Sequence, residues 1–193
     1  MGVKITLLFI IAAAGIYVID CAIGRRLLKP KLPDVLVWFF GVGMIGVFSE
    51  ILLNTIIAAI FGHPLWEYRV LPIRYGYISL VGPILWGLFG VHIYLQNLAL
   101  EKFYRKMKLW QKSLVMGVDA MIIETLLNLL AIGIIGDFFF YYFPADLGHF
   151  TSFVNLPLWF AGGLVIYKSM KHFIEAPYFV MGFSVVLVAG LLV

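Results

Sequence analysis

The sequence predicts an all-α, polytopic bundle of transmembrane helices, and three observations carry that prediction. Apolar and aromatic residues fill 63% of the 193 positions and charged residues only 12%, against roughly one half and one quarter in soluble domains. The apolar residues gather into runs of about 20, the length at which a helix crosses a bilayer. Most basic residues fall between those runs. We therefore expect a multi-pass protein of the cell (inner or plasma) membrane, with a single transmembrane domain over residues 1–193.

Six runs satisfy the length requirement, and the sequence predicts a helix for each. In chain order they are Ile5 to Ile23, Val35 to Phe61, Tyr77 to Leu100, Ser113 to Ile135, Phe150 to Met170 and Pro177 to Val193. The fifth run contains Pro157 and the last is only just long enough. A bundle of five helices is the main alternative.

Basic residues divide unevenly between the two ends of such a bundle. The segments after the first, third and fifth runs hold 11 of the 14 Lys and Arg residues, and the other end holds the remaining 3. Because cytoplasmic segments retain positive charge during insertion, both termini are predicted to be non-cytoplasmic. The net charge of +4 is then a topology signal, and no nucleic-acid partner is expected.

Cysteine and histidine offer little for metal chemistry. A lone Cys21 can form neither an internal disulfide nor a Cys-based zinc site. The four His residues stand far apart, with no pair at helical spacing, so no metal is expected. The sequence also has no Gly-rich phosphate motif and no Gly-x-Ser-x-Gly elbow, and we expect no cofactor.

An internal repeat is the most informative feature of the chain. Residues 43–94 align with residues 117–167, so the second and third helices repeat as the fourth and fifth. At an offset of 74 the matched positions are Gly43, Glu50, Asn54, Gly62 and Pro83 with Gly117, Glu124, Asn128, Gly136 and Pro157; after a one-residue slip they are Trp86, Gly90 and Tyr94 with Trp159, Gly163 and Tyr167. Both copies start from the same side, which predicts parallel repeats related by an axis along the membrane normal.

Each copy places a Glu and an Asn inside an apolar helix. Glu50 and Asn54 are four residues apart, as are Glu124 and Asn128, so each pair shares one helix face. Polar side chains in a membrane face the bundle interior, so the two carboxyls are expected to converge there and share a proton. The sequence predicts a functional polar site at the repeat interface. The alternative is a structural role, in which protonated Glu side chains tie helices together through Asn.

Further candidates lie around this site. Trp66, Tyr68 and Arg69 follow the second helix on the outer side, either as a rim over the site or as an aromatic belt with a snorkelling arginine. The repeat-matched tryptophans Trp86 and Trp159 complete the aromatic set that we expect to bind substrate. His92, in the third helix, is a candidate proton relay or a packing residue.

Two groups of charged residues receive no chemical role from the sequence. Asp20, Asp119 and Asp137 lie near helix ends, where contact with headgroups or water accounts for them. Residues 102–112 hold five basic residues among aromatic ones, and we interpret them as a topogenic anchor.

Residues 48 to 95 resemble known families. Trp66-Glu-Tyr68, Pro72, Gly76-Tyr-Ile-Ser-Leu80 and Trp86-Gly-Leu-Phe-Gly90 resemble a small bacterial membrane family named as ABC-transporter permeases, with Glu50 in the place of that family's helix glutamate. The layout of apolar helices, an intramembrane Glu and an aromatic loop is also similar to membrane carotenoid hydratases and cyclases. The first resemblance implies transport, and the second implies chemistry on an isoprenoid.

Three functional hypotheses remain open. The favoured one is a permease-like protein whose site for a small or lipid-like substrate, or for a proton, is built from Glu50, Asn54, Glu124 and Asn128. The second is a membrane-embedded enzyme in which Glu50 and Glu124 are the catalytic acid and base on an isoprenoid or another lipid. The third is an accessory subunit that binds a cytoplasmic or membrane partner. Membrane lipids are partners in each case.

Overall fold

The computed structural model describes residues 2–70, 73–74, 78–79 and 81–192. Its long helices are α1 (Gly2–Gly24), α2 (Leu32–Phe61), α3 (Gly82–Ala99), α5 (Leu109–Ile135), α6 (Asn155–Glu175) and α7 (Pro177–Leu192), and α4 (Glu101–Tyr104) is a single turn. Four short strands were not expected: β1 (Trp66–Tyr68), β2 (Ile73–Arg74), β3 (Ile78–Ser79) and β4 (Phe140–Tyr142). The predicted positions Pro72, Gly76, Tyr77, Leu80 and Val193 lie outside the described residues.

Each of the six predicted helices corresponds to one long helix, but two of the predicted starts are wrong. The third was expected to run from residue 77, whereas residues 78–79 form β3 and α3 begins at Gly82, with a proline in its first turn. The fifth was expected from Phe150, whereas α6 begins at Asn155. There the Val154 amide donates to the Ser152 hydroxyl, which holds the preceding residues in a turn.

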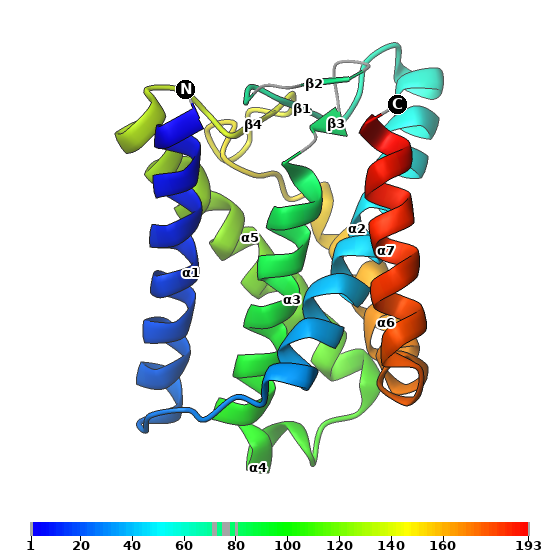
Figure 1. The fold of residues 1–193 in the computed structure, drawn as a ribbon. Coiled ribbons are helices and arrows are strands. Elements are labelled where there is room, and N and C mark those ends of the chain that lie inside the picture. Colours follow the sequence, from blue (N-terminus) through cyan, green and yellow to red (C-terminus); the bar gives the residue numbers. More distant parts are fainter. Residues whose placement is uncertain (1, 71–72, 75–77, 80, 193) are drawn as a thin grey trace.

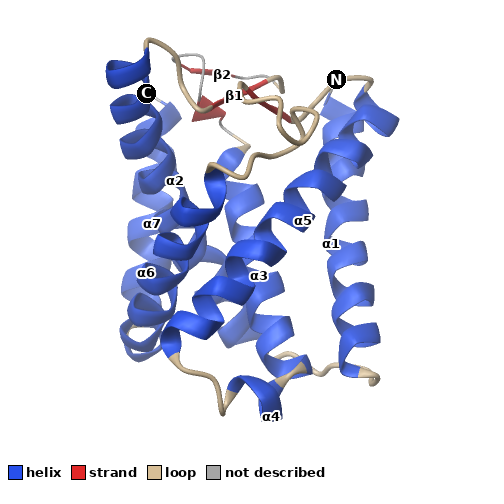
Figure 2. Ribbon diagram, turned by 180° about the vertical axis from the view of Figure 1, so that it is seen from behind, coloured by secondary structure: helices blue, strands red, loops and turns tan. Residues whose placement is uncertain are grey.

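The helices form one bundle around α3, with the strands across one end (Figure 1). α2 packs on α3 and α5 packs on α6, so each copy of the predicted repeat is a helical hairpin. α1 packs against α3 and α5, and α7 packs against α2. The N-terminal end of α1 and the C-terminal end of α7 lie beside the strands, and the three basic connections lie at the opposite end of the bundle (Figure 2).

Three helices in the described part of the chain are long and apolar enough to cross a membrane, namely α1, α2 and α5. Their outward surfaces are apolar: Ile10, Leu52 and Ile122 are each more than half exposed. A water-exposed bundle rarely shows contiguous apolar surface of this kind, so the surface is consistent with a lipid environment.

Glycines allow α2 and α3 to approach closely. A Cβ atom at Gly46 would lie 1.9 Å from the Trp86 ring, and one at Gly90 would lie 2.3 Å from the Trp38 carbonyl oxygen. No larger residue fits at either place without displacing a ring or a backbone segment. The close α2–α3 contact therefore depends on these two glycines.

One of the two pairs of short strands joins the two hairpins, whereas β2 pairs with β3 inside the α2–α3 connection. β1 pairs with β4 in antiparallel register, with Trp66 opposite Tyr142, Glu67 opposite Tyr141 and Tyr68 opposite Phe140. At the offset of 74, residues 66, 67 and 68 correspond to 140, 141 and 142. The first strand residue of each copy therefore pairs with the last strand residue of the other copy. An approximate two-fold axis through the Glu67 and Tyr141 pair would give this register.

Candidate functional site

A cavity of about 510 Å³ lies between the two hairpins, and α1 forms a further wall. Its lining is predominantly apolar, and Glu50 and Glu124 are the two charged residues that line it in the described part of the chain. The aromatic and amide side chains around these carboxyls are Trp66, Tyr68, Trp86, Phe89, Phe140, Tyr142, Asn155 and Trp159. The predicted convergence of the two glutamates at one site is consistent with this lining.

Each carboxyl accepts a hydrogen bond from a strand tyrosine. The Tyr68 hydroxyl, on β1, donates to Glu50 Oε1, and the Tyr142 hydroxyl, on β4, donates to Glu124 Oε1. Burial, and then the adjacent carboxyl, raises the pKa of each tyrosine hydroxyl well above its ordinary value. Both tyrosines therefore remain protonated donors throughout the physiological range.

The two asparagines position the strands and are not among the residues that line the cavity. Asn54 Oδ1 accepts the Leu65 amide at 3.2 Å. Asn128 Oδ1 accepts the Phe139 amide at 2.9 Å, and its Nδ2 donates to the Phe140 carbonyl at 2.9 Å. Each asparagine binds backbone groups at or just before the first residue of its own copy's tyrosine strand, so its contribution to the site is indirect.

The two glutamates differ in how many donors they meet. Glu124 accepts a second hydroxyl, that of Thr151, at 2.5 Å on Oε2, and the Asn155 amide lies 3.3 Å from its Oε1. Asn155 also donates to the Tyr142 hydroxyl at 2.7 Å. Both oxygens of Glu124 are thus held by the second copy's own side chains.

Glu50 has fewer partners among the described residues. Gly82 is the first residue of α3 as Asn155 is the first residue of α6, and a Cβ atom at Gly82 would lie 3.4 Å from Glu50 Oε2. Tyr68 donates to this carboxyl and the Trp86 indole lies beside it; no other described side chain is known to reach it. Within the described chain, Glu50 thus meets fewer donors than Glu124 does, and both carboxyls line the cavity.

The two matched tryptophans meet in the cavity wall. The Trp86 and Trp159 rings lie 5.0 Å apart between centroids, and Phe89 lies 5.1 Å from Trp159. The Trp159 Nε1 group is buried near Glu124 and makes no hydrogen bond within the described chain. The wall thus places aromatic faces next to both carboxyls.

One side of the cavity reaches the outer surface of the bundle. Its lining includes Ile11 and Ile19 on α1, Leu52 on α2, Leu126 on α5 and Val165 on α6, and all five are exposed. The β1–β4 pair lies across one end of the bundle, and its residues Trp66, Tyr68, Phe140 and Tyr142 line the cavity there. The cavity is therefore open sideways through apolar residues.

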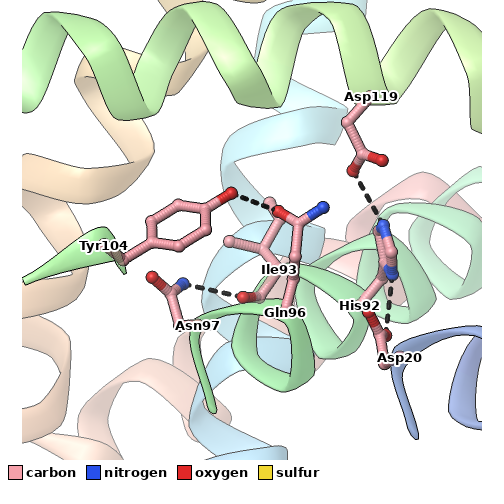
Figure 3. A network of polar contacts seen from close by, with 7 residues as sticks. All are labelled: Asp20, His92, Ile93, Gln96, Asn97, Tyr104 and Asp119. Atoms are coloured by element: carbon pink, nitrogen blue, oxygen red, sulfur yellow. Dashed lines mark hydrogen bonds and ion pairs between the residues drawn. The ribbon is translucent and has the colours of Figure 1, made fainter. Parts of the chain in front are cut away.

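Two predicted site residues lie away from this cavity. Arg69 pairs with Glu67 at 2.5 Å, stacks 5.1 Å from the centre of the Tyr141 ring and is 44% exposed. His92 is 1% exposed and lies between Asp20 and Asp119 (Figure 3). Asp20 was expected to contact headgroups or water, and that expectation is wrong, because the residue is fully buried.

The sequence reasoning missed three residues of the site. Tyr142 was recoverable, because it lies 74 residues after Tyr68, at the repeat offset. Thr151 and Asn155 break the repeat, since at the offset of 74 they align with Tyr77 and Val81, so no matched pattern pointed to them.

A helical bundle with an apolar, sideways-open cavity and two buried carboxyls is the class of protein that this fold and site define. No known protein family, no curated protein and no solved structure matches the chain.

Proposed function

We propose that this chain is a membrane-embedded enzyme that acts on a lipid-like substrate, such as an isoprenoid, with Glu50 exchanging a proton with the substrate. Three features of the cavity support a lipid-like substrate: the apolar lining, the opening between exposed apolar side chains, and a volume within the range of small-molecule sites. A polar solute would lose its hydration against these apolar walls without gaining hydrogen bonds in return.

The observation that carries the proposal is the difference between the two carboxyls. Glu124 accepts from Tyr142, Thr151 and Asn155, whereas among the described residues Glu50 accepts one hydroxyl, that of Tyr68; both carboxyls line the cavity. We therefore assign the role of acid and base to Glu50. Glu124, which accepts hydrogen bonds from three side chains, is assigned a structural role in the pocket wall. If Glu50 protonates a double bond, the faces of Trp86 and Trp159 can stabilise the resulting cation until a proton is returned to the carboxylate.

Deuterium exchange tests this chemistry directly. Purified protein in lipid nanodiscs is incubated in D₂O with prenyl and carotenoid lipids, and the deuterium content of the recovered lipids is measured by mass spectrometry. Wild-type protein should introduce deuterium into one lipid class, Glu50→Gln should introduce none, and Glu175→Gln, which alters an exposed carboxyl, should match wild type. Absence of deuterium in every lipid tested with folded wild-type protein would refute the enzymatic proposal.

Transport remains a second candidate, favoured by the location of the cavity between two matched hairpins. In that case the lipid-like molecule moves between leaflets without chemical change, and Glu50 carries a coupled proton. Reconstituted vesicles would then redistribute a fluorescent prenyl lipid, and Glu50→Gln would slow this movement while the lipid stays unlabelled by deuterium.

We further infer a multi-pass arrangement with all six long helices across the membrane and the basic connections in the cytoplasm. The support is the segregation of the three basic connections to one end of the bundle. Reporter fusions after residue 29 and after residue 106 should report a cytoplasmic location. A fusion after residue 146 should report the opposite side, and the same side for all three would overturn the arrangement.

A further inference from the structure

A buried cluster of three ionisable residues lies outside the cavity and takes no part in the proposed chemistry. His92 on α3 lies between two aspartates, with its Nδ1 2.9 Å from Asp20 Oδ2 on α1 and its Nε2 2.7 Å from Asp119 Oδ2 on α5 (Figure 3). Asp20 is 0% exposed, His92 is 1% exposed, and the Asp119 side chain is 18% exposed. We call these three residues the Asp–His–Asp cluster.

The geometry of this cluster fixes a minimum number of protons. A neutral imidazole carries one N–H, so only one of its nitrogens can donate. Here both nitrogens lie within hydrogen-bonding distance of a carboxyl oxygen, and two lone pairs cannot face each other at such a distance. The cluster must therefore hold one proton more than a neutral histidine and two ionised aspartates, either on the second ring nitrogen or on a carboxyl.

A second observation also indicates a proton site. Asp20 Oδ1 is buried and has no hydrogen-bond partner among the described residues. No described Lys or Arg forms an ion pair with either aspartate. A bound proton thus accounts for the arrangement better than any described cation does.

Several other polar residues of the described chain lie on the helices that hold the cluster or pack beside them. The Tyr104 hydroxyl on α4 donates to Gln96 Oε1 at 2.5 Å, and the buried Tyr167 hydroxyl on α6 has no hydrogen-bond partner among the described residues. On α1, Tyr17 and Cys21 bond to the backbone of Leu28. Two charged residues at the same end of the bundle have partners of their own: Asp34 of α2 accepts the Tyr94 hydroxyl, and Lys112 of α5 lies over the Tyr167 ring.

The cluster also holds a loosely packed helix. α1 buries three residues, Leu8, Ile16 and Asp20, over 23 positions. The same helix contributes Ile11, Ile16, Ile19 and two small residues to the cavity wall. Asp20 is the buried polar residue that ties this wall to α3.

We propose that the Asp–His–Asp cluster is a proton-binding site that controls the position of α1, and thereby the sideways opening of the cavity. With the proton bound, an imidazolium donates to both aspartates and joins α1, α3 and α5. When the proton leaves, two buried carboxylates remain with one N–H between them. That state is relieved by movement of α1, which allows water to reach Asp20. The inference does not depend on the substrate or on Glu50.

Nitrogen NMR tests the proton directly. Protein labelled with ¹⁵N-histidine in nanodiscs should show both His92 ring nitrogens with protonated, imidazolium-type shifts at about pH 7. The His92→Gln variant assigns the signal by its loss. A pair of unequal shifts, typical of one neutral tautomer, combined with two ionised aspartates by infrared spectroscopy, would overturn the proposal.

Distance measurements test the control of α1. Spin labels replace Val18 on α1 and Ile122 on α5, both exposed, in a Cys21→Ser background. A single short distance is expected at about pH 6, and a second, longer population at about pH 9. The matched control His172→Gln, which alters an exposed histidine, should keep this change.

A conservative variant keeps the test informative if His92→Gln does not fold. In Asp119→Asn, a neutral imidazole can donate to Asp20 and accept from the new amide, so no extra proton is required. The short distance should then persist at every pH. An unchanged distance in wild type between these pH values, or a pH-dependent change that persists in Asp119→Asn, would refute control of α1 by the cluster.

Discussion

Exchange of each glutamate for glutamine should separate the roles of the two carboxyls. Glu124→Gln leaves one acceptor oxygen where Tyr142, Thr151 and Asn155 all donate, and it places an amide NH₂ against a hydroxyl donor. At least one buried donor loses its acceptor, at a cost of about 1–3 kcal/mol. We expect Glu124→Gln to lower the free energy of unfolding by about 2 kcal/mol.

Glu50→Gln should be much less costly. The new amide oxygen can still accept the Tyr68 hydroxyl, and its NH₂ group can turn toward the cavity beside Gly82. The free energy of unfolding should change by less than about 1 kcal/mol, while deuterium exchange into the substrate is lost.

Unfolding by SDS in mixed micelles, followed by tryptophan fluorescence, measures both variants under the same conditions. The double variant Glu50→Gln with Glu124→Gln should be close to additive in stability if the two carboxyls are held independently. Equal destabilisation by the two single variants would refute the assigned asymmetry. A larger loss in Glu50→Gln would refute it as well.

Three further predictions concern packing, positioning and pH. Gly90→Ala places a Cβ atom 2.3 Å from a backbone oxygen of α2 and should cost about 1–3 kcal/mol in thermal unfolding, whereas Gly162→Ala, with open space around it, should not. Asn128→Ala should destabilise the protein more than Asn54→Ala in the same assay, because more described backbone groups lose their partner; the reverse order would contradict the positioning role. The pKa of the Tyr68 hydroxyl is raised in the folded protein, so its contribution to the free energy of unfolding is complete below its unfolded pKa of about 10 and is lost as the pH rises above that value. The midpoint temperature of unfolding should therefore fall above about pH 10. In Tyr68→Phe this fall should be less steep.

Run length predicted the helices well because backbone groups in an apolar segment satisfy one another most easily in a helix. It failed at the starts of α3 and α6, where residues before Gly82 and Asn155 are apolar enough to extend the run but belong to a strand or a turn. Two-residue and three-residue strands such as β1 and β4 leave no periodic signal.

The repeat indicated which polar residues matter but not what each one does. Glu50 and Glu124 were expected in one site, and both line the cavity. The asparagines could not be assigned from sequence, because their partners are backbone amides and carbonyls of the following loop. The partnership of Asp20 with His92 joins residues 72 positions apart, and no local spacing encodes it.

A native mass spectrum of the protein released from its own membranes tests the central claim, that the cavity holds a lipid-like molecule. Wild-type protein should carry one lipid-like adduct of defined mass. Gly162→Leu should remove it, because this glycine lines the cavity and has open space for a larger side chain. Gly133→Leu, at an exposed glycine of α5, should retain it. A wild-type spectrum without an adduct, or an adduct equally abundant in Gly162→Leu, would contradict the account.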